Sequence, residues 1–462
     1  MANSEHRDNI MTDTIRTSAV AGTFYPQKRD ELALQVYAYL NEHAKKTDTP
    51  PKALIVPHAG YVFSGSTAAA AYKQLQPFKN NYKRIVLVGS AHRTAVTGVV
   101  LPSAEYFSTP LGMVKLAKNF IKNIVAAGIA KYDDNAHQYE HSLEVQLPFI
   151  QMIFSNVEII PALMGDIAIE QAVKFLNSVW GDETTLLIIS SDLSHYHNAA
   201  TAQLIDGNTK RKVALNDPAV SNEQACAAIP INALLYLAQV KDLHSMLIDY
   251  SHSGEQSGDN DRVVGYLAAV LSANAHPDYQ LGSVLLRIAR AAISARWSEV
   301  PALLFPDYPR LSEPGATFVT LTKNDNLRGC IGSLQAHRTL FDDVQKNAVS
   351  SAFKDSRFSP LIQTELEQIN IEVSLLSASE PLQFSSEAEL LQQLRPDIDG
   401  IIFRYRNSAS TFLPQVWEQL PTAELFIQHL KQKAGLAANF WSTEVEVSRY
   451  TVQKWKESDY GR

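Results

Sequence analysis

Residues 54–61 have the sequence Leu-Ile-Val-Pro-His-Ala-Gly-Tyr, in which His58 directly follows a short run of large aliphatic side chains. Such a run is typical of a strand that is buried on both faces. His92 and His195 each follow a similar apolar run further along the chain. In open α/β sheets, ligands bind at the carboxyl ends of the strands. The three segments therefore predict a shared site at one edge of a sheet.

Strand-like and helical patterns alternate over residues 15–275. The apolar runs lie at 53–57, 84–90, 97–101, 157–163, 185–190 and 263–271. Helical patterns lie between them at 29–43, 65–76, 114–127, 142–154, 168–179, 200–216 and 230–239. This alternation predicts an α/β domain with a mostly parallel central sheet flanked by helices. Residues 272–279 have the composition of a linker.

The pattern changes in the last part of the chain, over residues 280–460. A helical pattern at 282–297 is followed by two strand patterns that a turn at 324–326 joins into a hairpin. The further expected strands and helices lie at 339–351, 370–377, 400–405 and 423–435. Neighbouring antiparallel strands with grouped helices predict an α+β domain.

The composition excludes several classes of protein. The chain has 462 residues, 45% of them hydrophobic and 19% charged, which predicts a globular protein of several domains. A net charge of −7 without a basic patch argues against binding to nucleic acid or to a membrane surface. The polar first 14 residues lack a signal-peptide core, and two cysteines are too few for a disulfide framework. We therefore expect a cytoplasmic protein.

His58 and His92 are the first candidates for metal ligands. Neutral imidazole binds iron, copper and zinc well, and an anionic third ligand would leave open positions for a substrate. Cys226 offers that ligand, because it precedes a predicted helix whose N-terminus would favour the thiolate. Tyr61 and Ser64, in the loop after His58, either line the pocket or serve only to pack that loop.

Two pairs of polar residues accompany these candidates. His141 and Glu144 are three residues apart, which places them on one face of a predicted helix. They form either a solvated N-terminal cap or a set of supporting residues around the site. Asp192 and His195 share the same spacing and could orient or deprotonate a ligand. Glu144 and Asp192 are also alternative carboxylate ligands.

A second concentration of signal is the heptapeptide Leu-Arg-Gly-Cys-Ile-Gly-Ser at residues 327–333. Gly329 and Gly332 on either side of Cys330 indicate a tight backbone or the close approach of another group. One interpretation is a strand with a bulge and a buried thiol. The other is a site in which Arg328 binds an anion and Cys330 reacts.

The residues of the first domain resemble the Memo-like family. Its signature is similar to residues 56–65, and the similarity continues through 89–92, 140–144 and 191–196. The resemblance covers nearly all of residues 15–275. It implies a fold similar to that of the class III (LigB-type) extradiol dioxygenases, which open catechol rings with non-haem iron.

The resemblance also implies a ligand set. His58, His92 and Cys226 would bind the metal, with Asp192 and His195 beside them. Iron(II) is the expected ion, with copper and zinc as alternatives. The dioxygenases have a glutamate where the Memo pattern has a cysteine, and thiolate is a softer and oxidisable ligand. Ring cleavage therefore does not transfer together with the fold.

The second domain resembles the AMMECR family, whose hallmark hexapeptide is present intact at residues 327–332. Residues 352–358 and 372–376 match the family as well, and the resemblance covers residues 280–460. It implies an antiparallel α+β domain and brings no established reaction. The two domains together resemble proteins B and A of the AmmeMemoRadiSam system, which implies a radical-SAM protein as a partner.

Three hypotheses of function follow. The first is a metal-dependent redox protein that works with a radical-SAM partner on an unknown small molecule or protein, with His195 as acid or base and Asp192 in support. The second is metal-free catalysis, in which Cys226 is the nucleophile and His195 its base in a hydrolase or transferase. The third is a non-enzymatic module for metal handling or binding, with the second domain as an adaptor.

Overall fold

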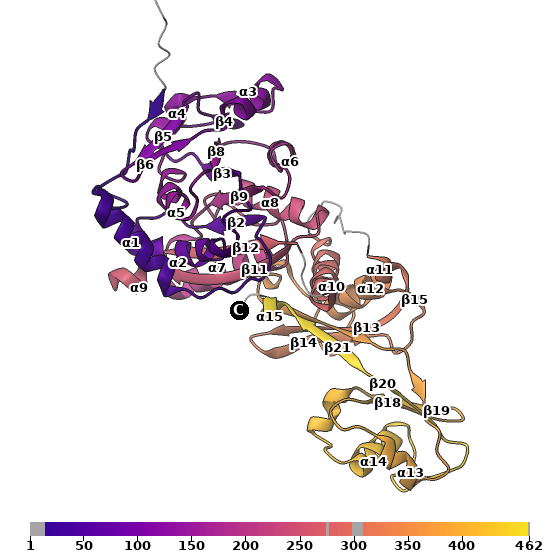
Figure 1. Ribbon diagram of the computed structural model, residues 1–462. Coiled ribbons are helices and arrows are strands. Elements are labelled where there is room, and N and C mark those ends of the chain that lie inside the picture. The colour runs from indigo at the N-terminus through magenta and orange to yellow at the C-terminus, as the bar shows by residue number, and fades with distance from the viewer. Residues whose placement is uncertain (1–13, 274–276, 298–307, 461–462) are drawn as a thin grey trace, which may run out of the picture. The chain divides into compact units, whose positions relative to one another are not determined.

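The computed structural model describes residues 14–273, 277–297 and 308–460, which form two compact units (Figure 1). The first unit extends to Gln280 and the second begins at Leu281. Helix α10 (Pro277–Ser294) crosses this boundary and begins inside the predicted linker at 272–279. Proline suits the first turn of a helix, because the amide hydrogen that it lacks has no partner there. Residues 274–276 of the predicted linker lie outside the described residues.

The centre of the first unit is a set of four parallel strands. They lie in the order β2 (Ala53–Val56), β9 (Thr185–Ser190), β3 (Arg84–Ser90) and β8 (Glu158–Met164). Almost all of their side chains are buried, as the uninterrupted apolar runs predict. Because the four strands run in the same direction, the residues that follow them meet at one edge of the sheet.

The prediction of a mostly parallel sheet is wrong, because antiparallel strands flank this centre and make the sheet mixed. Long strand β12 lies antiparallel to β2, and β11 lies antiparallel to β12, to which it is joined through a connection that contains the short helix α9 (Gly254–Ser257). On the other side, β4 lies antiparallel to β8. The flanking strands are β10 (His195–His197), β11 (His244–His252), β12 (Val263–Ser272), β4 (Val99–Leu101) and β7 (Lys131–Tyr132).

Helices cover both faces of this sheet. Consecutive side chains of a strand point to opposite faces. In β11, the Tyr250 hydroxyl donates to Asp206 of α7, whereas the Ser251 hydroxyl is bonded to Thr67 of α2. Helices α2 and α7 therefore lie on opposite sides. The helices are α1 (Arg29–Glu42), α2 (Tyr61–Lys73), α3 (Lys118–Ala126), α4 (Asp134–Gln138), α5 (Leu147–Ile153), α6 (Ile169–Ser178), α7 (Ala199–Ala214), α8 (Ala228–Val240) and α9 (Gly254–Ser257), with 3-10 turns η1 (Gln76–Phe78) and η2 (Glu144–Gln146).

Two predicted helices of this unit are shorter than expected. The pattern at 114–127 contains the end of strand β6 (Gly112–Lys115), which forms a small sheet with β5 (Tyr106–Thr109) and β1 (Ile15–Arg16). The pattern at 142–154 contains a turn before α5, because Pro148 has no amide hydrogen and fits only the first turn of a helix.

The second unit is antiparallel throughout its main sheet, as predicted for an α+β domain. The strands lie in the order β14, β13, β16, β21, and β15 pairs with the start of β13. Helix α12 packs against β13 and buries Val319 and Leu321. The elements are α11 (Pro309–Ser312), β13 (Pro314–Lys323), β14 (Asn326–Gly332), β15 (Arg338–Thr339), α12 (Leu340–Phe353), η3 (Gln363–Glu365), β16 (Ile369–Leu376), β21 (Val452–Lys456) and α15 (Glu457–Tyr460).

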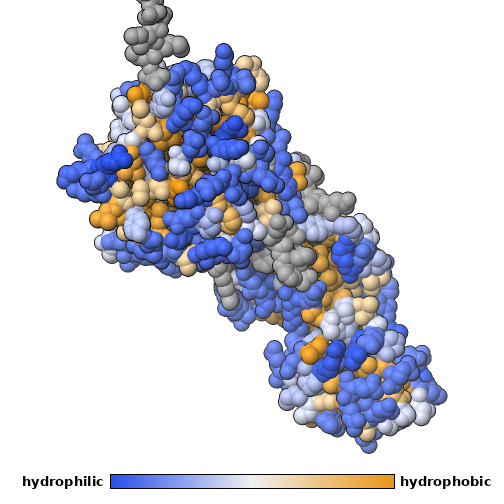
Figure 2. Space-filling view, viewed as in Figure 1, coloured by the Kyte–Doolittle hydropathy of each residue, from blue (hydrophilic) through white to orange (hydrophobic). Residues whose placement is uncertain are grey.

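A smaller antiparallel sheet completes the second unit. Its core contains Phe403, Trp417 and Phe426, and the last two rings are stacked with centroids 3.9 Å apart. Figure 2 shows one face of the protein, on which hydrophilic residues predominate and hydrophobic residues form smaller patches. Among the described residues, no helix combines the length and apolar character needed to cross a membrane. The elements are β17 (Glu380–Pro381), α13 (Glu387–Gln393), β18 (Gly400–Tyr405), β19 (Ser408–Phe412), η4 (Pro414–Glu418), α14 (Ala423–Lys433) and β20 (Glu446–Tyr450).

Candidate metal centre

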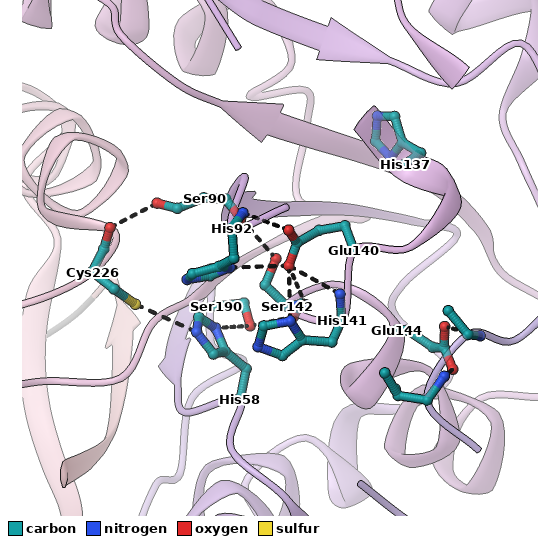
Figure 3. A network of polar contacts seen from close by, with 12 residues as sticks. His58, Ser90, His92, His137, Glu140, His141, Ser142, Glu144, Ser190 and Cys226 are labelled. Carbon is teal, nitrogen blue, oxygen red and sulfur yellow. Dashed lines mark hydrogen bonds and ion pairs between the residues drawn. The ribbon is translucent and has the colours of Figure 1, made fainter. Parts of the chain in front are cut away.

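Three histidines from three different loops meet at the carboxyl edge of the parallel strands. His58 follows β2, His92 follows β3, and His141 lies in the turn before η2. One ring nitrogen of each lies within 4.8 Å of one ring nitrogen of the others. Cys226, just before α8, adds a thiol whose Sγ is 3.4 Å from His58 Nε2 (Figure 3). Three imidazoles and a thiol form a donor set that suits a transition metal ion.

The His58 ring is oriented by the hydroxyl of Ser190. This hydroxyl donates its single hydrogen to the carbonyl of Ser142, at 2.6 Å. Its oxygen must therefore accept from its two other neighbours, the Gln146 amide at 2.9 Å and His58 Nδ1 at 3.1 Å. The hydrogen of the neutral ring is thus assigned to Nδ1, which leaves the Nε2 lone pair for a metal ion.

The His92 ring is oriented in the same sense by a carboxylate. Glu140 Oε1 lies 3.0 Å from His92 Nδ1, and Oε2 accepts from the His92 backbone at 2.6 Å. A carboxylate only accepts hydrogen bonds, so Nδ1 is the donor and Nε2 is again left for a metal ion. A carboxylate behind a histidine is the usual support of a metal ligand, because it fixes the ring and increases its basicity.

Glu140 also organises the turn that carries His141. Its Oε1 accepts from the backbone amides of His141 and Ser142, both at 2.9 Å. Hydrogen bonds from His92 and from this turn outweigh burial and lower the pKa of Glu140 well below its usual range. The turn approaches β3 closely because Gly89 has no side chain: a Cβ there would lie 2.7 Å from Ser142 Oγ.

Cys226 is held by its backbone beside the histidines. Its amide donates to the Asp192 carbonyl at 3.2 Å, and its carbonyl accepts from the Ser90 hydroxyl at 2.8 Å. Burial alone would raise the pKa of the thiol, but His58 and a hydrogen bond from His92 outweigh burial and lower it to about 6. The lowered pKa favours the thiolate at neutral pH, which is the form that binds metals.

The histidines differ in charge in the absence of a metal ion. Burial lowers the pKa of His58 and His92, but Cys226 together with Asp192 raises that of His58 to about 9. Cys226 and Glu140 raise the pKa of His92 to about 10. Burial and the neighbouring His58 lower the pKa of His141 to about 4, so this ring is neutral. Protons and a metal ion therefore compete for the ring nitrogens of His58 and His92.

The structure brings most of the predicted site residues together. Asp192 lies beside the cluster, because its Oδ1 accepts the backbone amide of His58 at 2.7 Å. His141 is more central than predicted, since its ring belongs to the cluster. The prediction that it shares a helical face with Glu144 is wrong, because the chain forms a turn there. His195 Nδ1 is bonded to the Leu193 carbonyl at 2.8 Å, and its role as acid or base stays a prediction.

Three predicted pocket residues have structural contacts instead. The hydroxyl of Tyr61 donates to the Val145 carbonyl at 2.6 Å inside the core, and Ser64 donates to the Ala59 carbonyl at 3.1 Å. Glu144 is fully buried and accepts hydrogen bonds from the segment that begins at Arg16. Its carboxylate is occupied by these donors, which argues against a role as a metal ligand.

Sequence reasoning missed the residues that orient the rings. Glu140, Ser190 and Gln146 are all buried, and they support His58 and His92. Glu140 had a signal, since it precedes His141 in the Glu-His-Ser-Leu-Glu segment. Ser190 had a weaker signal, as a polar residue directly after the aliphatic run at residues 186–189 of the strand.

The hexapeptide of the second unit is tied into its own fold. Arg328 forms two hydrogen bonds with Glu365, at 3.2 Å and 2.9 Å. The guanidinium that one interpretation assigned to an anion is therefore paired with a carboxylate of the same unit. Near Cys330, the hydroxyl of Ser351 donates to the Val319 carbonyl and accepts from the Ile331 amide. This hydroxyl is therefore inserted between β13 and β14.

The two glycines allow this packing. A Cβ on Gly329 would lie 2.2 Å from the Ser351 carbonyl oxygen, and one on Gly332 would lie 2.2 Å from the Phe318 ring. The register of β13 and β14 shifts near Gly329, as predicted for a bulge. The Cys330 thiol is half-buried and accepts from the Thr320 hydroxyl at 3.2 Å. These contacts favour the interpretation of the hexapeptide as a structural element.

The fold and the site thus define a two-unit protein whose first unit carries a candidate metal centre. The family model "Memo-like protein" matches residues 16–270, and the model "AMMECR1" matches residues 286–455. The chain belongs to the Memo-like family, with a Memo-like domain followed by an AMMECR1 domain.

Individual relatives match the first domain over nearly their whole length. A MEMO1 family protein of Aquifex aeolicus is 35% identical over 274 residues, which cover 55% of this chain and 98% of that protein. A MEMO1 family protein of Methanosarcina mazei is 34% identical over 275 residues, with coverages of 56% and 99%. A crystal structure of the uncharacterized protein PH0010 from Pyrococcus horikoshii matches at 28% identity and a TM-score of 0.35, covering 38% of this chain and 90% of that one.

Proposed function

We propose that the first unit binds a divalent transition metal ion through His58, His92, His141 and Cys226 and uses it in redox chemistry. The observation that carries the proposal is the orientation of the rings: two imidazoles are held by their Nδ1 atoms, so that both Nε2 lone pairs are left for a metal ion near the Cys226 thiolate. Iron(II) is the first candidate by family resemblance, and copper and zinc suit the same donors.

The ion would supply Lewis-acid and one-electron chemistry, and the protein residues set the conditions for it. Glu140 and Ser190 fix the two rings, and Asp192 holds the backbone of both His58 and Cys226. His92 is the most accessible ligand, with 28% of its side chain exposed. A substrate would therefore approach from the side of His92. His195, the first residue of β10, stays the proposed acid or base.

Metal analysis tests the proposal. We expect the full-length protein, purified without oxygen, to retain about one metal ion and to bind added Co²⁺ with the absorption bands of a thiolate ligand. The triple variant His58→Ala, His92→Ala, Cys226→Ala should lose both properties. The matched control is His429→Ala, which removes an exposed histidine of the second unit. Full metal content in the triple variant would show that the site is wrong.

We further propose that the protein acts in the cytoplasm with a radical-SAM protein on a small molecule or a protein, as the resemblance to the AmmeMemoRadiSam proteins implies. The experiment is co-incubation of both proteins with a cell extract. A change in an extract component that requires both the partner and the intact metal ligands would support this proposal. A change that the triple variant also produces would count against it.

A metal-free role of Cys226 is a second candidate, because its Sγ is 3.4 Å from an imidazole. That partner is His58, whereas the sequence suggested His195 as the base. A thiolate and imidazolium pair is the usual arrangement of a cysteine nucleophile. Stoichiometric alkylation of Cys226 in chelated protein, with a matching loss of turnover, would favour this role. Turnover that disappears on chelation and returns with added metal would exclude it.

A further inference from the structure

An N-terminal segment is built into the candidate metal centre. We call residues 15–25 the N-terminal strap. Its Arg16 is only 8% exposed and reaches into the loop that carries Glu140. The guanidinium donates to the His137 carbonyl at 3.0 Å and to the Glu140 carbonyl at 2.7 Å, and its third nitrogen pairs with the carboxylate of Glu144. One side chain thus holds three points of this loop.

The carboxylate of Glu144 completes the attachment. It accepts from the strap amides of Ala19 and Val20, at 2.8 Å and 3.0 Å, and from the Tyr25 hydroxyl at 2.5 Å. Glu144 is fully buried, and a buried charge that loses its partner is strongly destabilising. The strap and the loop therefore hold each other in place.

The strap also contacts two metal-ligand segments directly. The ring of Phe24 packs on the ring of His141, with centroids 4.8 Å apart. The carbonyl of Phe24 accepts at 2.7 Å from the amide of Tyr61, which begins α2 directly after the loop that carries His58. One residue of the strap thus connects the segments that carry two candidate ligands.

From these contacts we infer that docking of the strap is coupled to metal binding, with Arg16 as the positioning residue. This inference rests on the proposed metal site. Arg16 neutralises Glu144 and fixes the Glu140 backbone, which leaves the Glu140 carboxylate for His92 and for the amide of His141. Coupling of two binding events is reciprocal, so a metal ion must stabilise the docked strap as much as the strap favours the metal.

The first experiment is a Co²⁺ titration against a competing chelator on the full-length Arg16→Met variant. Residues that orient metal ligands typically contribute about 10- to 100-fold in affinity, and we expect a loss in that range together with an altered Co²⁺ spectrum. Arg16→Lys keeps the charge but lacks the planar fork, so its affinity should lie between those of Arg16→Met and the wild type.

The second unit offers a matched control. Arg290, 7% exposed, forms a buried pair with Glu457 and donates to the carbonyls of Leu366 and Ile369. Arg290→Met removes an equally buried arginine that bonds a carboxylate and two carbonyls. It should lower thermal stability without any change in the affinity or spectrum of bound Co²⁺. An equal loss of Co²⁺ affinity in both variants would assign the effect to general destabilisation and overturn the inference.

The second experiment needs no variant. Hydrogen exchange of the Ala19 and Val20 amides should slow by about tenfold or more when Co²⁺ saturates the wild-type protein, because the docked strap is then favoured. Unchanged exchange with Co²⁺ bound, or unchanged affinity in folded Arg16→Met, would overturn this inference alone. A wild-type protein that binds no Co²⁺ would overturn the proposed function and the inference with it.

Discussion

Polar groups are concentrated in the histidine cluster of the first unit and around strand β14 of the second unit. In the cluster they hold only one ring nitrogen each of His58 and His92, whereas around β14 they are paired with one another. In the cluster, Glu140 and Ser190 bond the Nδ1 atoms of the rings and leave the Nε2 atoms for a common ion. Around β14, Arg328 meets Glu365, and the backbone of Cys330 meets Asp355. A dense group of polar residues therefore indicates a binding site only when donor atoms remain for a ligand.

Removal of a ligand should separate the two regions most sharply. We expect His92→Ala to weaken Co²⁺ binding by more than about 100-fold, above the range of a supporting residue. Arg328→Ala, which breaks an equally distinctive motif, should leave Co²⁺ affinity unchanged. Chelator competition followed by absorption gives both values. Equal losses in the two variants would contradict the contrast between an open and a closed polar region.

The pH dependence of metal binding tests whether the histidine cluster of the first unit holds protons that a metal ion must displace. A metal ion needs neutral His58 and His92, whose pKa values are raised to about 9 and about 10, whereas the Cys226 pKa is lowered to about 6. Between pH 6 and pH 8 the thiolate is present but the rings hold protons, so binding must release protons. Affinity should rise with pH by about tenfold or more per unit.

Calorimetry in buffers of different ionisation enthalpy counts the released protons. We expect roughly one to two protons per Co²⁺ at pH 7. The Cys330→Ser variant is the control, because it changes the thiol of the second unit's β14, and it should release the same number of protons. Affinity that stays flat from pH 6 to pH 8 would contradict the proton-filled cluster.

The carboxylate behind His92 should have a smaller effect than the ligand. Glu140→Gln keeps the shape but replaces one acceptor oxygen by an amide donor, and Glu140 receives four hydrogen bonds, from His92, His141 and Ser142. We expect Co²⁺ affinity to fall by about 10- to 100-fold. Glu365→Gln makes the same change beside Arg328, and a comparable fall in that variant would refute the assignment.

Gly329→Ala tests the structural interpretation of the hexapeptide. The new methyl would lie 2.2 Å from the Ser351 carbonyl oxygen, so the strand or helix α12 must move. Overpacking of this kind typically costs about 1–3 kcal/mol, which chemical denaturation of the second unit would detect. Gly207→Ala, inside helix α7 with open space for a Cβ and an ordinary φ, controls for the loss of glycine itself and should not lower the stability of the first unit. A stable Gly329→Ala variant would reopen a functional role.

The sequence predicted the central strands of the first unit well, because their aliphatic runs are continuous over 84–90 and 185–190. It missed β11, whose side chains are only partly buried and do not alternate regularly. It assigned the end of β6 to a helix, because a strand of four residues carries too little periodicity to compete with the helical pattern beside it.

The site shows the same division. Residues that directly follow a buried strand, such as His58 and His92, could be grouped from topology alone. The position of His141 could not be predicted, because it depends on a turn fixed by Glu140 and on the space left by Gly89. Such contacts join distant parts of the chain, which local spacing does not encode.

The outer edge of β14 has one more consequence. The amide of Cys330 donates to Asp355, and its carbonyl accepts from Arg357, so that this charged pair takes the place of a neighbouring strand. An uncapped edge strand invites pairing with other chains and growth into fibrils. Asp355 and Arg357 thus occupy backbone groups of Cys330 that an incoming strand would need.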